Sequence, residues 1–421
     1  MFSKKTAQES DKKDALAKFR YSFGVNENEI YLDGNSLGKL PLNVPEIIGE
    51  VIEKQWGSKL IRSWNDHWLE LPKRISRTLE KILHADQNTV SIGDSTSVNL
   101  YKLVHGLLAS GKYPTHLISD CLNFPTDNYI LQGLGASFSI ASPTIVNYSS
   151  DLEADIELLK AKIKENPGIV CLSLVSYKSA YLYPMKALNL FAKEHQSIII
   201  WDLSHAVGAV HIDLKETDTL AAVGCTYKYL NGGPGAPAFL YVSASILPYL
   251  NTPIQGWFGH ARPFDFSAEF IPSRGIEKFD AGTPSILSIA AMEAGIDLTH
   301  TAGIESIRKK SEALTSFLQL GIETELIPLG YTLESPPNSA KRGSHITISH
   351  HESWRICKAL MEGKKNRPKI IPDFRPNRFI RLGIAPLYMS FEEIWTTVER
   401  LKEIVLENEF LAFDQERPTV T

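Results

Sequence analysis

The chain has 421 residues, of which 43% are hydrophobic and 22% are charged, and its formal net charge at pH 7 is −4. These values are typical of a soluble globular protein that has a large core and two domains. A slightly acidic chain gives no electrostatic reason to expect binding to nucleic acid or to an anionic membrane.

The spacing of the cysteines and the length of the apolar runs indicate the cellular compartment of the protein. The four cysteines, Cys121, Cys171, Cys225 and Cys357, lie far apart and show no CxxC or metal-type spacing, which indicates reduced thiols. The N-terminal stretch MFSKKTAQESDKKDALAKF lacks the apolar run of a secretory signal, and no run is long enough to span a bilayer. We therefore expect a cytoplasmic protein with no membrane contact and no metal site.

Short apolar runs alternate with amphipathic stretches in the middle of the chain, which is the pattern of βαβ units. We expect strands at TVSIGD (89–94), THLISD (115–120), SFSIA (137–141), GIVCLSLVS (168–176), SIIIWDL (197–203) and APAFLYVS (236–243). We expect helices at 95–108, 121–134 and 185–195. This order predicts an α/β fold with a mostly parallel sheet flanked by helices on both faces.

The pattern changes near residue 300. Helix (303–320), strand (344–350), helix (353–363), strand (378–384) and a last helix follow one another, and Ser390 and Glu393 form a capping box that opens the last helix. We expect a smaller α+β domain here. The predicted division is an N-terminal segment at 1–45 that packs on the body, a large α/β domain at 46–300 and a C-terminal domain at 301–421.

Lys228 is the first candidate for chemistry. It lies in GCTYKYLNGGPG (224–235), between Tyr227 and Tyr229 and before a run of glycines. Apolar and aromatic surroundings disfavour a charged ammonium group, which leaves the amine available as a nucleophile or base. Lys228 is therefore a candidate Schiff-base lysine, although most lysines are simply solvated.

Asp202 and His205 follow the predicted strand SIIIW. An unpaired carboxylate at the tip of a buried strand is costly, so Asp202 requires a cation, and a protonated heterocyclic nitrogen would serve. His205 could stack on a ring or bond to it, although a histidine near apolar residues is more often part of a core. The chain between Asp202 and Lys228 has room for one more crossover that returns to the same sheet edge.

Two further turns follow predicted strands. In DSTSVNL, Thr96 and Ser97 open a helix whose amino end could hold a phosphate, and the alternative is a plain helix cap. In CLNFPTD, Phe124 and Asp127 offer an aromatic face and a carboxylate, and the alternative is an ordinary turn. Lysine, carboxylate, histidine, aromatic ring and phosphate site at one sheet edge together match the needs of pyridoxal 5′-phosphate (PLP).

At this point the sequence resembles a known family. WDLSHAVGAVHIDL (201–214) followed by GCTYKYLNGGPG is similar to the signature of the kynureninases, which are PLP-dependent enzymes of fold type I, the aspartate aminotransferase-like fold. The resemblance continues through YLDGNSLG (31–38), IRSWNDHW, DSTSVNL, FPTD, GWFGH, GTPS and RFIRLGIAPLY, and the spacing resembles bacterial members. Ser204 departs from the family pattern, which has alanine there, and a small hydroxyl should be tolerated.

The resemblance implies cofactor-binding roles for the matching residues. Lys228 would hold PLP covalently and move protons, Asp202 would pair with the ring nitrogen, and Asp127 would be a second acceptor. Phe124 would stack on the ring and His205 would help to hold it. The remaining contacts would come from Thr96, Ser97, Tyr227 and Trp257 at the phosphate, from Thr283 of the other subunit, and from Ser173. This arrangement implies a homodimer with shared sites.

The resemblance also implies a substrate side. Arg381 would bind the substrate carboxylate, with a surface ion pair as the alternative because RFIRL contains two arginines. Asn35, Ser36 and Trp64 match substrate-side positions, and each could instead be structural. Trp64 favours L-kynurenine over the 3-hydroxylated substrate.

The implied activity is hydrolysis of L-kynurenine to anthranilate and L-alanine in tryptophan catabolism, with 3-hydroxykynurenine as a further candidate substrate. Tyr227 is a candidate acid or base. Two rivals, an aminotransferase and a cysteine desulfurase, would share the fold and the cofactor. A non-catalytic scaffold is the rival from another class, and the presence of Lys228 and Asp202 argues against it.

Overall fold

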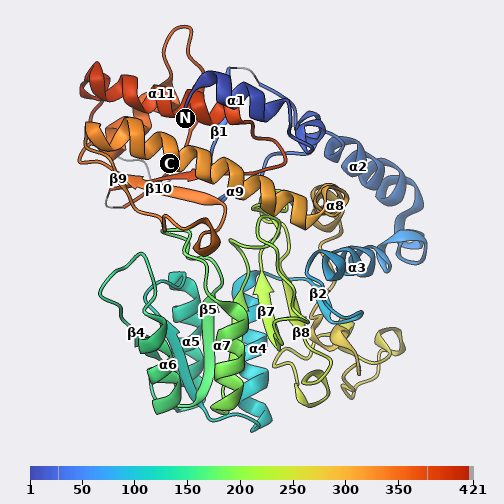
Figure 1. Ribbon diagram of the computed structural model, residues 1–421. Helices are drawn as coiled ribbons and strands as arrows, with labels where there is room; N and C mark the ends of the chain where they lie inside the picture. The colour runs from blue at the N-terminus through green and yellow to red at the C-terminus, as the bar shows by residue number, and fades with distance from the viewer. Residues whose placement is uncertain (27, 377, 417–421) are drawn as a thin grey trace.

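The computed structural model describes residues 1–416 except 27 and 377. It contains three sheets (Figure 1). The helices are α1 (Lys4–Asp11), α2 (Val44–Glu50), α3 (Leu71–Ile82), α4 (Thr96–Ser110), α5 (Pro125–Ser137), α6 (Ile156–Glu165), α7 (Met185–Glu194), α8 (Ile286–Ala302), α9 (Ile304–Gly321), α10 (Ser353–Glu362) and α11 (Phe391–Leu406). Among the described residues, no helix combines the length and apolarity that crossing a membrane requires.

A seven-stranded sheet has the order β2-β8-β7-β6-β5-β3-β4. Its strands are β2 (Val90–Ile92), β3 (His116–Asp120), β4 (Thr144–Val146), β5 (Gly168–Ser173), β6 (Ile198–Asp202), β7 (Ala221–Gly224) and β8 (Phe239–Val242). The five strands from β4 to β7 pair in parallel, and β8 runs antiparallel to both β7 and β2. The mostly parallel sheet predicted from the sequence is thus confirmed.

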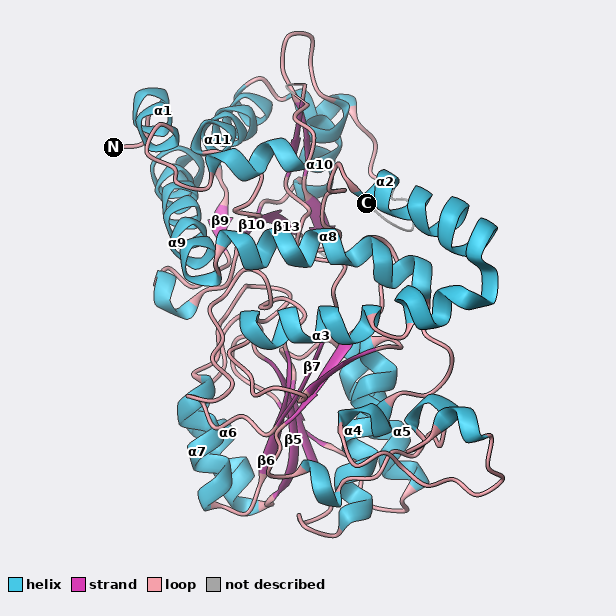
Figure 2. Ribbon diagram, turned by 90° about the vertical axis from the view of Figure 1, so that its right-hand side faces the viewer, coloured by secondary structure: helices cyan, strands magenta, loops and turns pink. Residues whose placement is uncertain are grey.

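Helices cover both faces of this sheet. Figure 2 shows the strands between α6 and α7 on one side and α4 and α5 on the other. Successive residues of β5 belong to different cores: Val170 and Leu172 join the core with α3, α6 and α7, whereas Ile169 and Cys171 join the core with α4 and α5. Because both faces are buried, β5 reads as a continuous apolar run instead of an alternating one.

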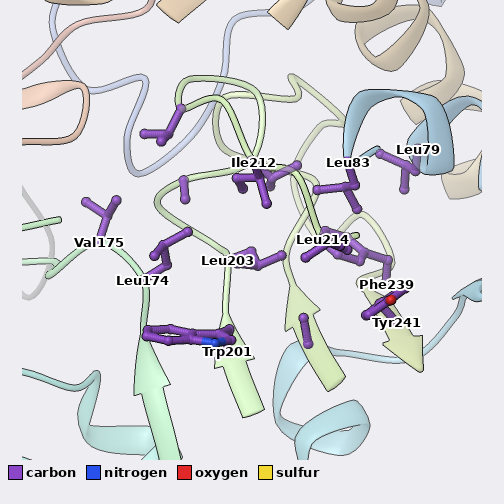
Figure 3. Close-up of a cluster of buried hydrophobic side chains, with 14 of the residues drawn as sticks. Leu79, Leu83, Leu174, Val175, Trp201, Leu203, Ile212, Leu214, Phe239 and Tyr241 are labelled. Atoms are coloured by element: carbon purple, nitrogen blue, oxygen red, sulfur yellow. The ribbon is translucent and has the colours of Figure 1, made fainter. Parts of the chain in front are cut away.

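The core between the sheet and α3 is shown in Figure 3. Leu79 of α3 and Leu83, the residue that caps its carboxyl end, lie near Ile212 and Leu214 of the loop after β6, above Phe239 and Tyr241 of β8. The connection between β6 and β7, which contains Ile212 and Leu214, consists of turns and includes no helix.

The C-terminal lobe, which we define as residues 304–416 except 377, has its own core and sheet. The four-stranded antiparallel sheet has the order β12-β13-β10-β9, with β9 (Thr332–Leu333), β10 (His345–Ser349), β12 (Asp373–Arg375) and β13 (Phe379–Gly383). The predicted capping box is confirmed, because Ser390 Oγ accepts from Glu393 N and the Glu393 carboxylate accepts from Ser390 N.

The N-terminal segment packs on this lobe. β1 (Glu29–Tyr31) pairs in parallel with β11 (Lys369–Ile371), and α1 packs against α11. Figure 1 shows the N-terminal end of the chain in the upper half, where the lobe lies across the upper end of the seven-stranded sheet. The division at residues 45 and 300 stays a prediction.

The predicted strand SFSIA is wrong. Residues 138–140 wrap around the end of α5, where Phe138 N donates to Leu134 O and Ile140 N donates to Gly135 O. Ser139 has a positive φ of 53°, which extended strands do not adopt. The strand, β4, begins after Pro143 instead.

Candidate active site

The carboxyl ends of the central parallel strands carry the predicted residues. Ser173 ends β5, Asp202 ends β6, and the two are register partners; Asp202 is also paired with Val223 of β7. The loop after β5 contacts the C-terminal lobe through a β-bridge between Tyr181 and Arg342. The lobe therefore covers the edge at which ligands bind in open α/β sheets.

Lys228 lies in a tight loop after β7. Its side chain is half-buried, and Nζ is 2.9 Å from Nε2 of His205 and 5.8 Å from the centre of the Tyr227 ring. Asn231 N donates to Lys228 O. Gly38 packs against the same loop so closely that a Cβ there would lie 2.3 Å from Lys228 O. The N-terminal segment thus fixes the position of the lysine backbone.

His205 is an uncharged partner for this lysine. Burial lowers the pKa of His205 well below its usual range, and the charges of Lys228 and Arg381 lower it further. A neutral imidazole with its proton on Nδ1 accepts from Lys228 Nζ through Nε2. Nδ1 is buried and has no hydrogen-bond partner among the described residues.

Asp127 and Asp202 form a buried carboxyl pair. Asp127 lies in the first turn of α5 and is 3% exposed, and Asp202 is 6% exposed. Burial raises the pKa of both groups, and the neighbouring Asp202 raises the pKa of Asp127 further. Ser204 N donates to Asp202 Oδ1 at 2.8 Å, whereas Asp127 Oδ2 has no partner among the described residues. A protonated ring nitrogen fits this pair, because it supplies both the missing donor and the missing positive charge.

The aromatic and hydroxyl candidates surround this pair. Phe124 is the N-cap residue of α5, is 40% exposed and meets Tyr177 edge-on at 5.3 Å. Its exposed face is available for stacking on a ring. Ser173 Oγ donates to Asn123 Oδ1 at 2.5 Å. Asn123 therefore ties the end of β5 to the start of α5.

The amino end of α4 offers two hydroxyl groups. Ser95 is the N-cap, and its Oγ accepts from Val98 N at 3.3 Å. Thr96 and Ser97 are the first helical residues, so neither is the cap. Their hydroxyls, together with the helix dipole, fit a phosphate group.

Arg381 is buried, which rules out the surface ion pair considered from the sequence. The side chain is 1% exposed; Nε donates to Asp373 Oδ2, one terminal nitrogen to Tyr177 O at 2.6 Å and the other to Ser36 Oγ at 3.0 Å. Asn35 is fully buried, and a Cβ on Gly383 would lie 1.9 Å from its Oδ1. β13 and the N-terminal segment thus bring Arg381, Ser36 and Asn35 together.

Trp64 and Trp257 both pack against Phe258, whereas Thr283 lines a groove that includes neither tryptophan. Trp64 packs against Trp68 and Phe258, with ring centres 5.4 and 5.9 Å apart, and Trp257 packs against Phe258 at 4.3 Å. Thr283 is exposed and lines an apolar groove of about 730 Å³. The single chain does not place these three side chains in the cluster around Lys228.

Sequence reasoning missed several neighbours of the site. His345 is fully buried, and its ring centre lies 5.8 Å from that of His205. Asp373 holds Arg381, and burial together with Asp373 raises the pKa of Asp33 to about 6. The segments of His345 and Asp373, SHITISH and IPDFRP, carry no local pattern that points to the sheet edge. Asn123, inside CLNFPTD, and Asp33, inside YLDGNSLG, lie in stretches quoted above for other residues.

Comparison with known proteins places the chain among homologues over nearly its whole length. Residues 307–401 match the family described as kynureninase C-terminal domain. The chain is 38% identical over 401 residues to a kynureninase of Pseudomonas fluorescens, with 94% of each chain covered. It is 35% identical over 409 residues to a kynureninase of Burkholderia pseudomallei strain K96243, covering 95% of this chain and 96% of the relative.

Solved structures with the same fold are more distant in sequence. An apo cysteine desulfurase from Thermococcus onnurineus NA1 has a TM-score of 0.79 at 18% identity and covers 93% of this chain and 98% of its own. A C-DES mutant with glycine covalently linked to its PLP cofactor also has a TM-score of 0.79 at 18% identity. This match covers 91% of this chain and 99% of the C-DES chain. These likenesses show the PLP-enzyme fold of type I.

Replacement of Asp127 by Asn should change the pH dependence of stability of the cofactor-free protein. The raised pKa of Asp127 means that the folded state favours the protonated carboxyl, so stability falls as the pH rises from the ordinary value of 3.8 through the folded-state pKa. Asparagine stays neutral. In denaturant titrations we expect the free energy of unfolding of Asp127→Asn to exceed that of wild type at pH 8, and the difference to be smaller at pH 4. We also expect the variant to bind PLP more weakly.

The exposed Asp86 supplies the control. Asp86→Asn should follow the wild-type pH profile. Equal effects of Asp127→Asn at pH 4 and pH 8 would show that the buried pair carries no electrostatic cost.

Proposed function

Because the chain belongs to the kynureninase family, we propose that it hydrolyses L-kynurenine to anthranilate and L-alanine, with PLP bound at Lys228. One observation carries this proposal: Lys228 Nζ is hydrogen-bonded to a neutral His205 and lies beside the buried carboxyl pair of Asp127 and Asp202. A homologue that is 38% identical over 94% of the chain supports the assignment of the reaction.

The residues of the cluster fit PLP. We assign Lys228 to the covalent attachment, Asp202 and Asp127 to the ring nitrogen, and Phe124 and His205 to the ring. Ser173 lies at the same edge, next to Asp202 in register, and is assigned to the cofactor as well. Thr96, Ser97 and Tyr227 are assigned to the phosphate.

PLP supplies an electron sink for the carbanion that forms when the substrate α carbon loses its proton. Lys228 Nζ takes and returns protons at that carbon, and His205 holds Nζ by its 2.9 Å hydrogen bond. Burial raises the pKa of Tyr227, so its hydroxyl stays protonated and can donate a proton. A positioned acid of this kind contributes roughly 10²–10⁴-fold to a rate.

The substrate side is assigned to Arg381, Ser36, Asn35 and Trp64. The two terminal nitrogens of Arg381 donate to Tyr177 O and Ser36 Oγ, and a substrate carboxylate that replaces these acceptors would bind both nitrogens in a bidentate manner. Burial lowers the pKa of Arg381, and Asp373, which accepts from Nε, opposes this shift and orients the guanidinium. A preference for L-kynurenine over 3-hydroxykynurenine remains a proposal that depends on Trp64.

The burial of the thiols argues against the desulfurase rival. Cys171, Cys225 and Cys357 are buried and Cys121 is half-buried. Burial raises the pKa of Cys225 and Cys357, which disfavours the thiolate that a nucleophile requires.

A homodimer would complete the site. The groove beside Thr283 exposes Trp56, Leu60 and Ile61, whose exposed fractions are 57%, 57% and 75%. An exposed apolar surface of this kind is typical of an interface. We infer that a second copy covers the groove and that Trp257 and Thr283 of each copy reach the phosphate in its partner. The cytoplasmic location stays a prediction.

Replacement of Lys228 by Ala should abolish the activity. The purified wild-type protein should be yellow with bound PLP and should release fluorescent anthranilate from L-kynurenine. Lys228→Ala should lose the absorption band of the lysine-bound cofactor and form no anthranilate, because no other amine lies beside His205 in the described cluster.

Two outcomes would contradict this assignment. A wild-type protein that binds no PLP would refute the cofactor site. A yellow protein that converts L-kynurenine to a keto acid would favour an aminotransferase instead.

Replacement of Arg381 by Lys should weaken substrate binding. A charge-assisted hydrogen bond contributes about 1.5–3 kcal/mol, so kcat/KM for L-kynurenine should fall by about 10- to 150-fold, mainly through KM. The matched control is Arg378→Lys in the same RFIRL stretch, where the side chain is 64% exposed and pairs with Glu334. Equal effects of the two variants would exclude a special role for Arg381.

Replacement of Ile61 by Glu should prevent dimer formation, because a carboxylate would be buried at the proposed interface. Sedimentation velocity should show a dimer for wild type and a monomer with little activity for Ile61→Glu. Ile327→Glu is the control, since Ile327 is 45% exposed and lies outside the groove. A fully active monomer would refute the shared site.

A further inference from the structure

A cluster of potential metal ligands lies outside the proposed active site. His84 follows α3, His211 lies in the loop after β6, and Glu305 is in the first turn of α9. The exposed fractions of the His84, His211 and Glu305 side chains are 34%, 38% and 66%, and one ligand atom from each lies within 4.8 Å of the others. Sequence analysis could not detect this cluster, because three distant segments contribute one residue each.

The distances between the two imidazoles and the Glu305 carboxylate fit coordination of one shared metal ion better than they fit hydrogen bonds. Nε2 of His84 and Nε2 of His211 each lie 3.6 Å from Oε1 of Glu305. Nitrogen–oxygen hydrogen bonds are shorter, at about 2.7–3.2 Å. Two ligand atoms on one tetrahedral zinc ion, each bonded at about 2.1 Å, are about 3.4 Å apart.

Asp213 orients one of the two imidazoles. Its Oδ2 is 3.2 Å from Nδ1 of His84, and its Oδ1 accepts from Glu216 N at 2.7 Å. This contact favours the tautomer with hydrogen on Nδ1, which leaves the Nε2 lone pair of His84 facing Glu305 and His211. A carboxylate that holds the outer nitrogen of a histidine ligand is a common feature of metal sites.

The backbone holds the ligands in place. Leu83, next to His84, and Ile212 and Leu214, on either side of Asp213, point into the core shown in Figure 3. Leu214 N donates to Leu83 O at 3.1 Å and joins the two segments directly. Ile304 and Ile307 anchor the first turn of α9 in the core of the C-terminal lobe. A site held by buried neighbours needs little rearrangement to bind an ion.

We propose that His84, His211 and Glu305 bind one divalent cation of the Zn²⁺ class, with Asp213 orienting His84 and water completing the coordination. Two imidazoles and one carboxylate are a donor set that suits Zn²⁺ and leaves a fourth position open. The ion connects the loop after β6, which carries His205, to α9, and so fastens the seven-stranded sheet to the C-terminal lobe.

Zn²⁺ titration of the PLP-loaded protein, after removal of free PLP, tests the proposal. Competition with a chromophoric chelator should show one tight site per chain. His211→Ala and Glu305→Gln should each lose that site, and Asp213→Asn should weaken it by about tenfold or more. Thermal unfolding of wild type should shift to higher temperature with Zn²⁺, because an ion that binds the folded state stabilises it.

The control is His116→Ala, which removes an exposed histidine at the opposite end of the sheet, the start of β3. It should bind Zn²⁺ as wild type does. Circular dichroism and PLP absorption of each variant report whether the fold is intact. Substitution by Co²⁺ should give the visible bands of a four-coordinate ion in wild type and not in His211→Ala.

Tight Zn²⁺ binding that survives in both His211→Ala and Glu305→Gln would overturn the proposal. So would the absence of a tight site in wild type. Neither result would affect the assignment of PLP to Lys228, since the two sites share no residue.

Discussion

The Asp127 and Asp202 carboxyl groups occupy a buried position that becomes favourable only when positive charge is nearby. Lys228 supplies part of that charge, and its electrostatic effect lowers the pKa of both groups. Burial opposes it and dominates, so the unliganded site is poised to accept a cationic ring nitrogen. The ends of β6 and β7, the start of α5 and the loop around Lys228 all serve to hold this pair beside the amine.

The same low-dielectric environment explains the state of the histidines. His205 and His345 are both buried, and burial lowers the pKa of each far below its usual range. Two neutral imidazoles next to Lys228 and Arg381 avoid adding to the positive charge of the site. The C-terminal lobe contributes His345 and Arg381, so it shapes the electrostatics of the site and also covers it.

The sequence was informative where chemistry and local pattern coincide. Asp202, His205 and Asp127 each follow a predicted strand whose apolar run is clear, and the topology rule for ligand sites then places them at one edge. No strand was predicted before Lys228, where the structure has the short strand β7, and Lys228 was assigned to the same edge from its separation from Asp202. SFSIA was misassigned because its apolar alternation continues past a helix end that is fixed by backbone hydrogen bonds. Asp373 and His345 were missed because their proximity to the site depends on how the C-terminal lobe packs. Thr283 could not be placed, since its predicted partner belongs to another copy of the chain. Trp257, which was predicted at the phosphate of its own copy, packs against Phe258.

The close packing of Gly38 against the Lys228 loop affects when the site can form during protein synthesis. Residues 29–38 are synthesised early, yet their contacts are with Lys228 O, with β11 and with Gly383 and Arg381, all made much later. The segment around Gly38 and Arg381 therefore cannot form these contacts on a ribosome-bound chain until residues near 383 have emerged. Such long sequence separations slow folding and delay completion of the site. A nascent chain would thus stay inactive throughout almost all of its translation.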